Sequence, residues 1–212
     1  MANKLEIFVL ATLFLTPAFV ILSHCAAAPS LFAVHPAANA VSHLILSPLA
    51  IYLMITRKSI GDAPTRLTLV KAHFALQFLA FLIMGSGGAA VYLNKDKMGK
   101  AHFTSTHSWV AGASGTLWSL NLLGGTATTF LGAKADWTWK NPGHRVGGVV
   151  GFLGCGATVL YGLHSGEWAA KTLGADKQFK VTVLVAAAYA ALLLKAVLSL
   201  GAKPKGAAKK TA

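Results

Sequence analysis

Acidic side chains are scarce in this sequence, and charged side chains as a class are few. Among 212 residues, only six are Asp or Glu, 12% carry a charge and 55% are hydrophobic. A soluble domain of this length does not need so many apolar residues to fill one core. The composition therefore excludes an ordinary soluble globular protein and indicates a chain embedded in a membrane.

Cysteine is also rare. Cys25 and Cys155 are the only two, and each falls in or beside an apolar segment with no second cysteine nearby. This spacing excludes a disulfide framework and a paired-cysteine metal or redox motif. We expect both to be small packing residues, and they do not identify a redox compartment.

Positive charge, by contrast, is in excess, with a formal net charge of +13. Such an excess can mark a nucleic-acid-binding protein. Here, however, the Lys and Arg residues lie in the tails and in the short polar breaks between apolar stretches. That distribution is typical of membrane topology, so we expect no nucleic-acid partner.

Six apolar stretches divide the chain, each close to or above the roughly 20 residues that cross about 30 Å of hydrocarbon as an α-helix. They predict an all-α membrane protein, a six-transmembrane-helix bundle that forms one domain over residues 1–201. A basic, disordered cytoplasmic tail is expected at 202–212. The first stretch could be a signal peptide, but its length favours a retained helix. The stretches span residues 5–27, 31–55, 67–93, 102–131, 146–163 and 181–200.

The Lys and Arg residues are distributed unequally between the two faces of the bundle. With six spans, both termini share a face with the breaks around 57–66 and 134–145, and most of the cations lie there. Because cytoplasmic loops carry the excess of Lys and Arg, both termini are predicted to be cytoplasmic. The plasma membrane and an endomembrane both stay open as locations.

Histidine is the residue type that carries chemistry in this sequence. A histidine inside a membrane is costly unless it is paired, hydrogen-bonded or bound to a metal. Of the eight histidines, four lie within about two turns of the start of consecutive stretches, the second to the fifth. These four are His35, His73, His107 and His144.

Antiparallel helices begin on alternate sides, which sorts the four histidines into two pairs by depth. His35 and His107 are predicted toward the non-cytoplasmic face, and His73 and His144 toward the cytoplasmic face. Two facing imidazoles at one depth can supply both axial ligands of a haem iron, with the porphyrin between the helices. The pairs therefore predict two b-type haems within the second to fifth helices, a core of about residues 31–165.

Each of these features has another explanation. A single intramembrane histidine is more often hydrogen-bonded to a neighbouring helix, and glycines in these helices suit close packing as well as a flat prosthetic group. Zinc is a weaker alternative, because a closed tetrahedral site needs four ligands together. For His43, expected near mid-membrane, a hydrogen bond is favoured over a place between the haems. His24 and His164 are expected near the non-cytoplasmic face, without an assigned role.

Four segments around the paired histidines resemble the cytochrome b561 family of ascorbate-dependent transmembrane reductases. The break NKDKMGKAHFTSTH resembles the short, six-helix branch of that family. One difference is Asn39, where the family commonly has a methionine. The segments are FAVHP at His35, KAHFALQFLA at His73, STHSW at His107 and NPGH at His144.

The resemblance implies a transmembrane ascorbate-dependent oxidoreductase with two haem b cofactors, usually a homodimer. Electrons would pass from cytoplasmic ascorbate to monodehydroascorbate or a ferric chelate on the opposite face, which is the activity of a monodehydroascorbate or ferric reductase. Lys71 matches a family position that helps to hold ascorbate, and Arg66 and Arg145 are candidates to join it. His102 is the candidate residue for binding the outer acceptor.

Two other functions remain compatible with these residues. One is a haem-bearing membrane anchor subunit that passes electrons to a protein partner. The other is a haem-free transporter or scaffold, in which the histidines only join helices. The first predicts bound haem without activity from ascorbate alone, and the second predicts no visible absorbance.

Overall fold

The computed structural model describes residues 4–200 and shows a helical protein in this range. The elements α2, η1, α3 and η2 follow one another without a break and form a single rod, Leu31–Ser59, of 29 residues. The described chain therefore has six helical rods, which confirms the prediction of an all-α, six-helix fold. In order, the elements are α1 (Lys4–Ala27), α2 (Leu31–Ala40), η1 (Val41–Leu46), α3 (Ser47–Thr56), η2 (Arg57–Ser59), α4 (Ala63–Lys97), α5 (Thr106–Phe130), α6 (Pro142–His164) and α7 (Glu167–Leu198).

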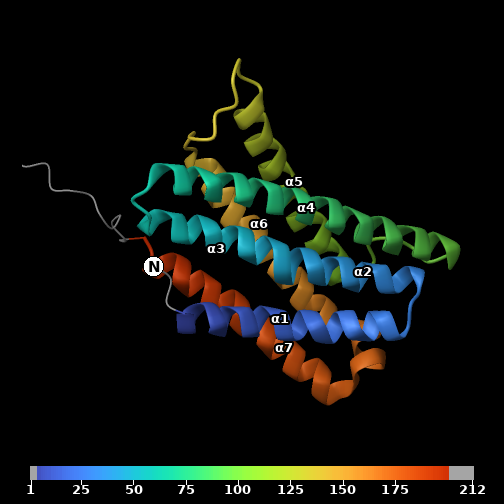
Figure 1. Cartoon of the computed structure of the whole chain (residues 1–212). Helices are drawn as coiled ribbons and strands as arrows, with labels where there is room; N and C mark the ends of the chain where they lie inside the picture. Colours follow the sequence, from blue (N-terminus) through green and yellow to red (C-terminus); the bar gives the residue numbers. More distant parts are fainter. Residues whose placement is uncertain (1–3, 201–212) are drawn as a thin grey trace, which may run out of the picture.

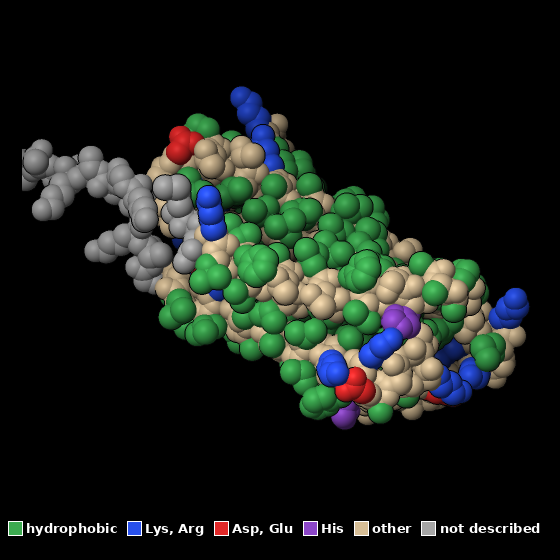
Figure 2. Space-filling view, turned by 60° about the horizontal axis from the view of Figure 1, so that its bottom comes forward, with side chains coloured by type: hydrophobic (Ala, Val, Ile, Leu, Met, Phe, Trp, Pro, Cys, Tyr) green, Lys and Arg blue, Asp and Glu red, His purple; other side chains and the backbone are tan. Residues whose placement is uncertain are grey.

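Five of the six rods are long and apolar enough to cross a membrane. The exception is α5, whose 25 residues suffice in length but include many Gly, Ser and Thr residues. Such small side chains lower the hydropathy of a helix while allowing close packing, and α5 packs along α6. Figure 2 shows hydrophobic side chains over the middle of one flank, with Lys and Arg gathered toward the ends.

The start of α5 differs from the sequence prediction because a capping residue decides it. The stretch predicted to begin at residue 102 becomes helical only at Thr106. The Ser105 hydroxyl accepts a hydrogen bond from the Ser108 N–H, and the Ser108 hydroxyl accepts one from the Ser105 N–H. This reciprocal capping box fixes the first turn. His102 therefore lies in the connection before α5 and not in a helix.

The last helix also begins earlier than predicted. The apolar stretch starts at residue 181, whereas α7 starts at Glu167 and bends at Gly174. Gly174 has a φ of 72°, a conformation that glycine adopts without strain. Ala169 and Leu173, before the bend, are buried in the main hydrophobic core. Ala169 and Leu173 thus hold the first turns of α7 against the core. The mean hydropathy of this polar segment does not reveal these two buried residues.

A π-helical segment, η1, lies in the middle of the second rod. Pro48 lacks an N–H, so the Leu44 carbonyl cannot receive the usual hydrogen bond from four residues ahead. The helix widens before the proline, and the Ser47 N–H donates to the Ser42 carbonyl five residues back. The side chains of Ser42 and His43 are buried here, and the Ser42 hydroxyl donates to a carbonyl of α4 at 2.9 Å.

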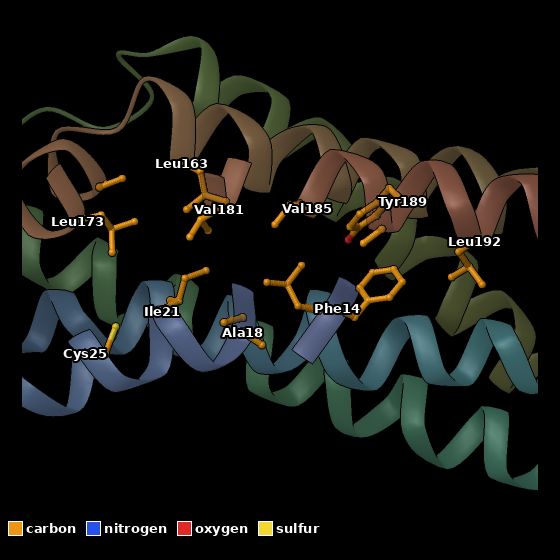
Figure 3. Packing of buried hydrophobic residues seen from close by; sticks show 14 of the residues in the cluster. Phe14, Ala18, Ile21, Cys25, Leu163, Leu173, Val181, Val185, Tyr189 and Leu192 are labelled. Atoms are coloured by element: carbon orange, nitrogen blue, oxygen red, sulfur yellow. The ribbon is translucent and has the colours of Figure 1, made fainter. Parts of the chain in front are cut away.

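The rods form two hairpins and a flanking pair (Figure 1). The second rod lies along α4, and α5 lies along α6, whereas α4 and α5 make few contacts with each other. The helices α1 and α7 lie side by side and pack against the second rod and α6. In their shared core, Phe14 and Ile21 of α1 face Val185 and Tyr189 of α7 (Figure 3). The flanking pair thus supports the hairpins from one side.

Both ends of the described chain lie on the same side of the molecule (Figure 1). We name this side the terminal face; α4 and α6 also begin there. The other side, where α2, α5 and α7 begin, is named the opposite face. The predicted tail, residues 202–212, lies outside the described residues.

A polar contact joins α1, α3 and α7 near the terminal face. The Glu6 carboxylate accepts hydrogen bonds from the Tyr52 hydroxyl at 3.1 Å and from the Lys195 ammonium at 2.7 Å. The side chains of Lys195 and Glu6 are only 29% and 27% exposed. Hydrogen bonds to shielded charged groups contribute more to stability than exposed ion pairs do. The contact therefore fastens the flanking pair to the second rod.

We expect the Glu6→Gln substitution to lower the free energy of unfolding by roughly 1–3 kcal/mol, because Lys195 keeps its charge and loses its counter-ion. The measurement is the thermal unfolding midpoint of the detergent-solubilised protein. Lys171→Gln is the matched control, because it breaks the exposed pair of Lys171 with Glu167, and exposed ion pairs of this kind contribute little to stability. Equal midpoints for the two variants would contradict a stabilising role for Glu6.

Candidate functional site

The structure brings the four histidines of the hairpins together in two pairs. The rings of His35 and His107 have centroids 6.1 Å apart and planes at 88°. His73 and His144 lie close enough to interact electrostatically. Because α2 and α5 begin at the opposite face and α4 and α6 at the terminal face, the two pairs lie at different depths. This is the grouping that the order of the histidines predicts.

Three of the four imidazoles are held from behind by a hydrogen bond to the neighbouring helix. The bonds join Nδ1 of His35 to the Gly87 carbonyl, Nδ1 of His107 to the Thr158 carbonyl and Nδ1 of His73 to the Ala50 carbonyl, at 3.1, 3.0 and 3.0 Å. A carbonyl oxygen only accepts, so the proton of each ring is on Nδ1. Nε2 is then left with a free lone pair, which is the form of imidazole that binds a metal.

His144 is held mainly by packing. Its Nδ1 is buried and makes no hydrogen bond of good geometry within residues 4–200, although the Asn121 backbone lies beside it. The Trp139 ring packs edge-on against the imidazole, with centroids 4.9 Å apart. On another side, a Cβ added to Gly125 would lie 3.0 Å from His144 Cε1. The Trp139 N–H donates to the Thr129 hydroxyl at 2.9 Å, which fixes the indole.

The spacing of these contacts reveals an internal repeat. His35 and its carbonyl partner are 52 residues apart, and His107 and its partner are 51 apart. His73 and its partner are 23 residues apart, as are His144 and Asn121 (144 − 121 = 23). The two hairpins are therefore built alike, with one histidine toward each face. Each pair takes one histidine from each hairpin.

Glycines allow two of the histidine rings to pack closely against a neighbouring helix. A Cβ on Gly162 would lie 3.0 Å from His107 Cε1, as the Gly125 position does for His144. A pocket of about 170 Å³ opens next to His144, between α5 and the connection to α6. A second pocket of about 410 Å³, between α1 and α2, is lined mostly by apolar residues and by none of the four histidines. The pocket lined by His144 is the one that bears on the site, because its walls carry the polar groups.

The terminal face beside His73 is strongly cationic. Arg57, at the end of the second rod, lies close enough to Arg66 of α4 and Arg145 of α6 to interact with both, and it also acts on His73. None of the three arginines forms a salt bridge with a residue in the described range. The Asp62 carboxylate lies near enough to Arg66 to interact with it, which still leaves the group with an excess of positive charge that attracts an anion. The structure thus brings Arg66 and Arg145 toward one site and adds Arg57 to them.

Lys71, the predicted donor-site residue, lies over an aromatic ring. Its Nζ is 5.7 Å from the centroid of Trp137, which belongs to the connection between α5 and α6. Trp137 also meets Phe74 of α4 and Phe130 of α5, with centroids 5.6 and 5.2 Å apart. These rings join α4 to the end of α5, where the helices otherwise make few contacts. The aromatic cluster therefore closes the terminal face between the hairpins.

The connection between α5 and α6 is an ordered turn. The Asp136 N–H donates to the Thr129 carbonyl at 2.9 Å. The backbone N–H of Thr138, together with its hydroxyl, donates to the Asp136 carboxylate and holds the pKa of that carboxyl below its usual value. The turn places Trp137 toward α4 and Trp139 toward His144.

The remaining histidines lie outside the two pairs. On the opposite face, His102 Nε2 is 2.8 Å from the Asp96 carboxylate, and the His102 ring stacks on Tyr92. His24 bonds through Nδ1 to a carbonyl of its own helix at 2.8 Å, and His164 is exposed at the end of α6.

The sequence favours a ring hydrogen bond for His43, and the structure does not show one among the described residues. Its side chain is 4% exposed, and neither ring nitrogen has a hydrogen bond to another residue in the described part of the chain. The ring instead lies edge-on to Trp118, with centroids 5.5 Å apart. It is the His43 backbone carbonyl that accepts a hydrogen bond, from the Tyr189 hydroxyl at 2.9 Å.

Three residues of this site were missed by sequence reasoning. Arg57 was only one of many cations predicted for its face, and nothing in the spacing singled it out. Trp137 and Trp139 carried a readable signal, because two of the five tryptophans of the chain stand two positions apart just before the NPGH segment. Amphipathic aromatic side chains in a short polar connection are typical of contacts at the membrane interface or with a bound group.

Comparison with known proteins finds a family match over the part of the chain that contains the two histidine pairs. A family model described as eukaryotic cytochrome b561 matches residues 34–170, which include all four paired histidines. The chain is 30% identical over 174 residues to the Transmembrane reductase CYB561D2 of Mus musculus, over 81% of this chain and 73% of that protein. It is 30% identical over 149 residues to the protein of the same name of Homo sapiens, over 69% of this chain and 67% of that protein.

Proposed function

The chain belongs to the cytochrome b561 family, and the relatives compared above are named transmembrane reductases. We propose that it carries electrons from ascorbate to an acceptor on the other side of the membrane. His35 with His107, and His73 with His144, would each hold one haem b. The donor would bind at the terminal face, which we place in the cytoplasm. The acceptor, monodehydroascorbate or a ferric chelate, would bind at the opposite face.

The observation that supports this proposal best is the hydrogen bonding of the imidazole rings, which sets their protonation and orientation. Carbonyl oxygens behind His35, His73 and His107 fix the proton on Nδ1 and leave Nε2 free to bind a metal. Two imidazoles that bind one ion from opposite sides through bonds of about 2.0 Å have centroids roughly 6 Å apart. The His35 and His107 centroids are 6.1 Å apart. The residues therefore fit a bis-histidine haem, whose iron, when bound, takes up and releases one electron at a time.

The terminal face supports the binding of an anionic donor. Ascorbate carries one negative charge at neutral pH, and Arg57, Arg66 and Arg145 form a group with excess positive charge there. Lys71 lies on the same face over Trp137 and can turn its ammonium toward the same anion. Cations at the mouth of a largely apolar bundle raise the local concentration of such a donor. The excess of cations also supports a cytoplasmic location for this face and for both termini.

A reconstitution experiment tests the proposal. The purified full-length protein is placed in liposomes that contain trapped ferricyanide, and ascorbate is added outside. We expect ascorbate to produce a reduced haem spectrum and the trapped acceptor to lose its absorbance, because electrons cross the bilayer. A colourless folded protein would refute the proposal. Bound haem that ascorbate does not reduce would favour an anchor subunit that passes electrons to a protein partner.

A pair of glycine variants tests which histidine belongs to which haem without removing a ligand. Gly125→Ala places a methyl group 3.0 Å from His144 Cε1, and Gly162→Ala places one 3.0 Å from His107 Cε1. In each case we expect the ring to shift by a few tenths of an ångström, because real Cβ contacts are rarely so close. The midpoint potential of one haem should therefore change in Gly125→Ala and that of the other in Gly162→Ala, in a redox titration of absorbance.

Each variant is the control for its partner, since the unaffected haem reports on the overall fold. A change in the same haem in both variants would contradict the assignment of the pairs. Unchanged potentials in both would show that the glycines do not govern the position of the imidazoles.

The arginine group predicts a salt-dependent effect on the donor. We expect Arg57→Gln to raise the KM for ascorbate roughly fivefold at low ionic strength, about 1 kcal/mol of lost attraction, with a smaller effect in high salt. The measurement is the rate of haem reduction against ascorbate concentration. Lys58→Gln makes the same charge change at the neighbouring, exposed position. If both variants raised the KM equally, the effect would belong to the general charge of the face and not to a donor site.

A further inference from the structure

The opposite face carries a second group of chemically active side chains, near the His35 and His107 pair but separate from it. Tyr92 and Asp96 lie on the last turns of α4, and His102 follows in the connection to α5. His102 Nε2 is 2.8 Å from Asp96 Oδ1. The His102 and Tyr92 rings are stacked, with centroids 4.1 Å apart and 14° between their planes. A carboxylate and an aromatic face thus hold one imidazole from two directions.

The backbone on both sides of His102 is also fixed. Before it, the Lys95 ammonium donates to the Ala101 carbonyl at 2.9 Å. After it, Phe103 has a φ of 52°, which residues other than glycine rarely adopt. The Phe103 ring packs against Trp109 with centroids 5.7 Å apart. The imidazole is therefore held in one position and is not a freely turning surface side chain.

The arrangement suits a histidine that gives and takes protons. The Asp96 carboxylate accepts a hydrogen bond from Nε2 and so orients the ring. Nδ1 makes no hydrogen bond to another residue within the described range, so it is available to a substrate. The His102 side chain is 26% exposed, which allows water to return a proton to it. Histidines held by a carboxylate in this way act as general acids and bases.

The group also lies near the place where electrons would leave the protein. His102 precedes His107 by five residues, and Lys95 acts electrostatically on His107. The charged and titratable groups around His102 are few. Lys95, Asp96 and Tyr92 come from α4, Lys100 comes from the connection, and Glu167 of α7 interacts with Lys100. The first two turns of α5 add no ionisable side chain except His107.

We propose that His102 donates a proton to the electron acceptor, that Asp96 is its positioning residue, and that the acceptor is an organic radical and not a ferric chelate. This inference rests on the proposed function and chooses between its two acceptors. Monodehydroascorbate, a radical anion, becomes the ascorbate monoanion by gaining one electron and one proton. A ferric chelate gains one electron and needs no proton donor.

The step balances with groups already named. The electron originates from ascorbate at the terminal face and arrives through the His35 and His107 site. The proton comes from the His102 imidazolium: its N–H bond breaks, an O–H bond forms on the reduced acceptor, and neutral imidazole remains. Water then protonates the imidazole again. Asp96 keeps the ring in place throughout and is not consumed.

The test compares two acceptors on one protein. The full-length holoprotein is reduced with a stoichiometric amount of dithionite, so that the result does not depend on ascorbate as donor, and is then mixed with monodehydroascorbate or with ferricyanide. Reoxidation is followed by absorbance. In His102→Gln, we expect reoxidation by monodehydroascorbate to slow roughly tenfold or more, because a general acid contributes at least about that much. Reoxidation by ferricyanide, which needs no proton, should be unchanged.

Three controls separate proton donation from a structural effect. His164→Gln changes an exposed histidine at the end of α6 and should alter neither rate. Free imidazole should restore part of the lost rate in His102→Gly. Deuterium oxide should slow the wild-type reaction with monodehydroascorbate and not that with ferricyanide. The visible spectrum and thermal midpoint of His102→Gln should match those of the wild type.

Two results would overturn the inference. Equal slowing with both acceptors would mean that His102 affects electron transfer or folding and not proton supply. Unchanged rates with both would mean that the dyad has no part in the reaction. A protein that reoxidises as expected but is not reduced by ascorbate would count against the proposed donor and leave the role of His102 supported.

Discussion

The arrangement depends on one contact, a hydrogen bond between an imidazole Nδ1 and a backbone carbonyl of the neighbouring helix. It occurs at His35, His73 and His107. A carbonyl that receives such a bond already has its own helical partner, so the helix loses nothing by accepting a second donor. The bond satisfies the buried N–H of the ring and points its other nitrogen away from the partner helix. In a membrane, where water cannot supply the missing partner, this contact decides where the imidazole lies.

The remaining architecture keeps those contacts in place. Each histidine is fixed within its own hairpin, so the two hairpins can be built separately and then brought together around a bound group. The flanking helices α1 and α7 lie mostly outside the matched residues 34–170. They support the hairpins through the core around Phe14 and Tyr189 (Figure 3) and through the Glu6 and Lys195 contact. The connection between α5 and α6, which carries Trp137 and Trp139, closes the terminal face, and the turn around His102 lies at the opposite face.

The fold could be read from the sequence because membrane spans depend on length and hydropathy, which are local properties. The grouping of His35 with His107 and of His73 with His144 could also be read, because alternation of antiparallel helices sorts residues by depth. The exact helix starts could not, since they depend on caps such as Ser105 that hydropathy does not register. His102 was therefore placed in a helix, although it lies in a connection. Arg57, Trp137 and Trp139 depend on how a connection folds back across the helices, and His43 on a π-helical turn before Pro48.

The pairing of the histidines is tested most directly by the electron paramagnetic resonance spectrum of the oxidised, purified protein. We expect two low-spin ferric haem signals. One should be absent from both His35→Ala and His107→Ala, and the other from both His73→Ala and His144→Ala. Loss of the same signal in His35→Ala and His73→Ala, or a single signal in the unaltered protein, would contradict this pairing.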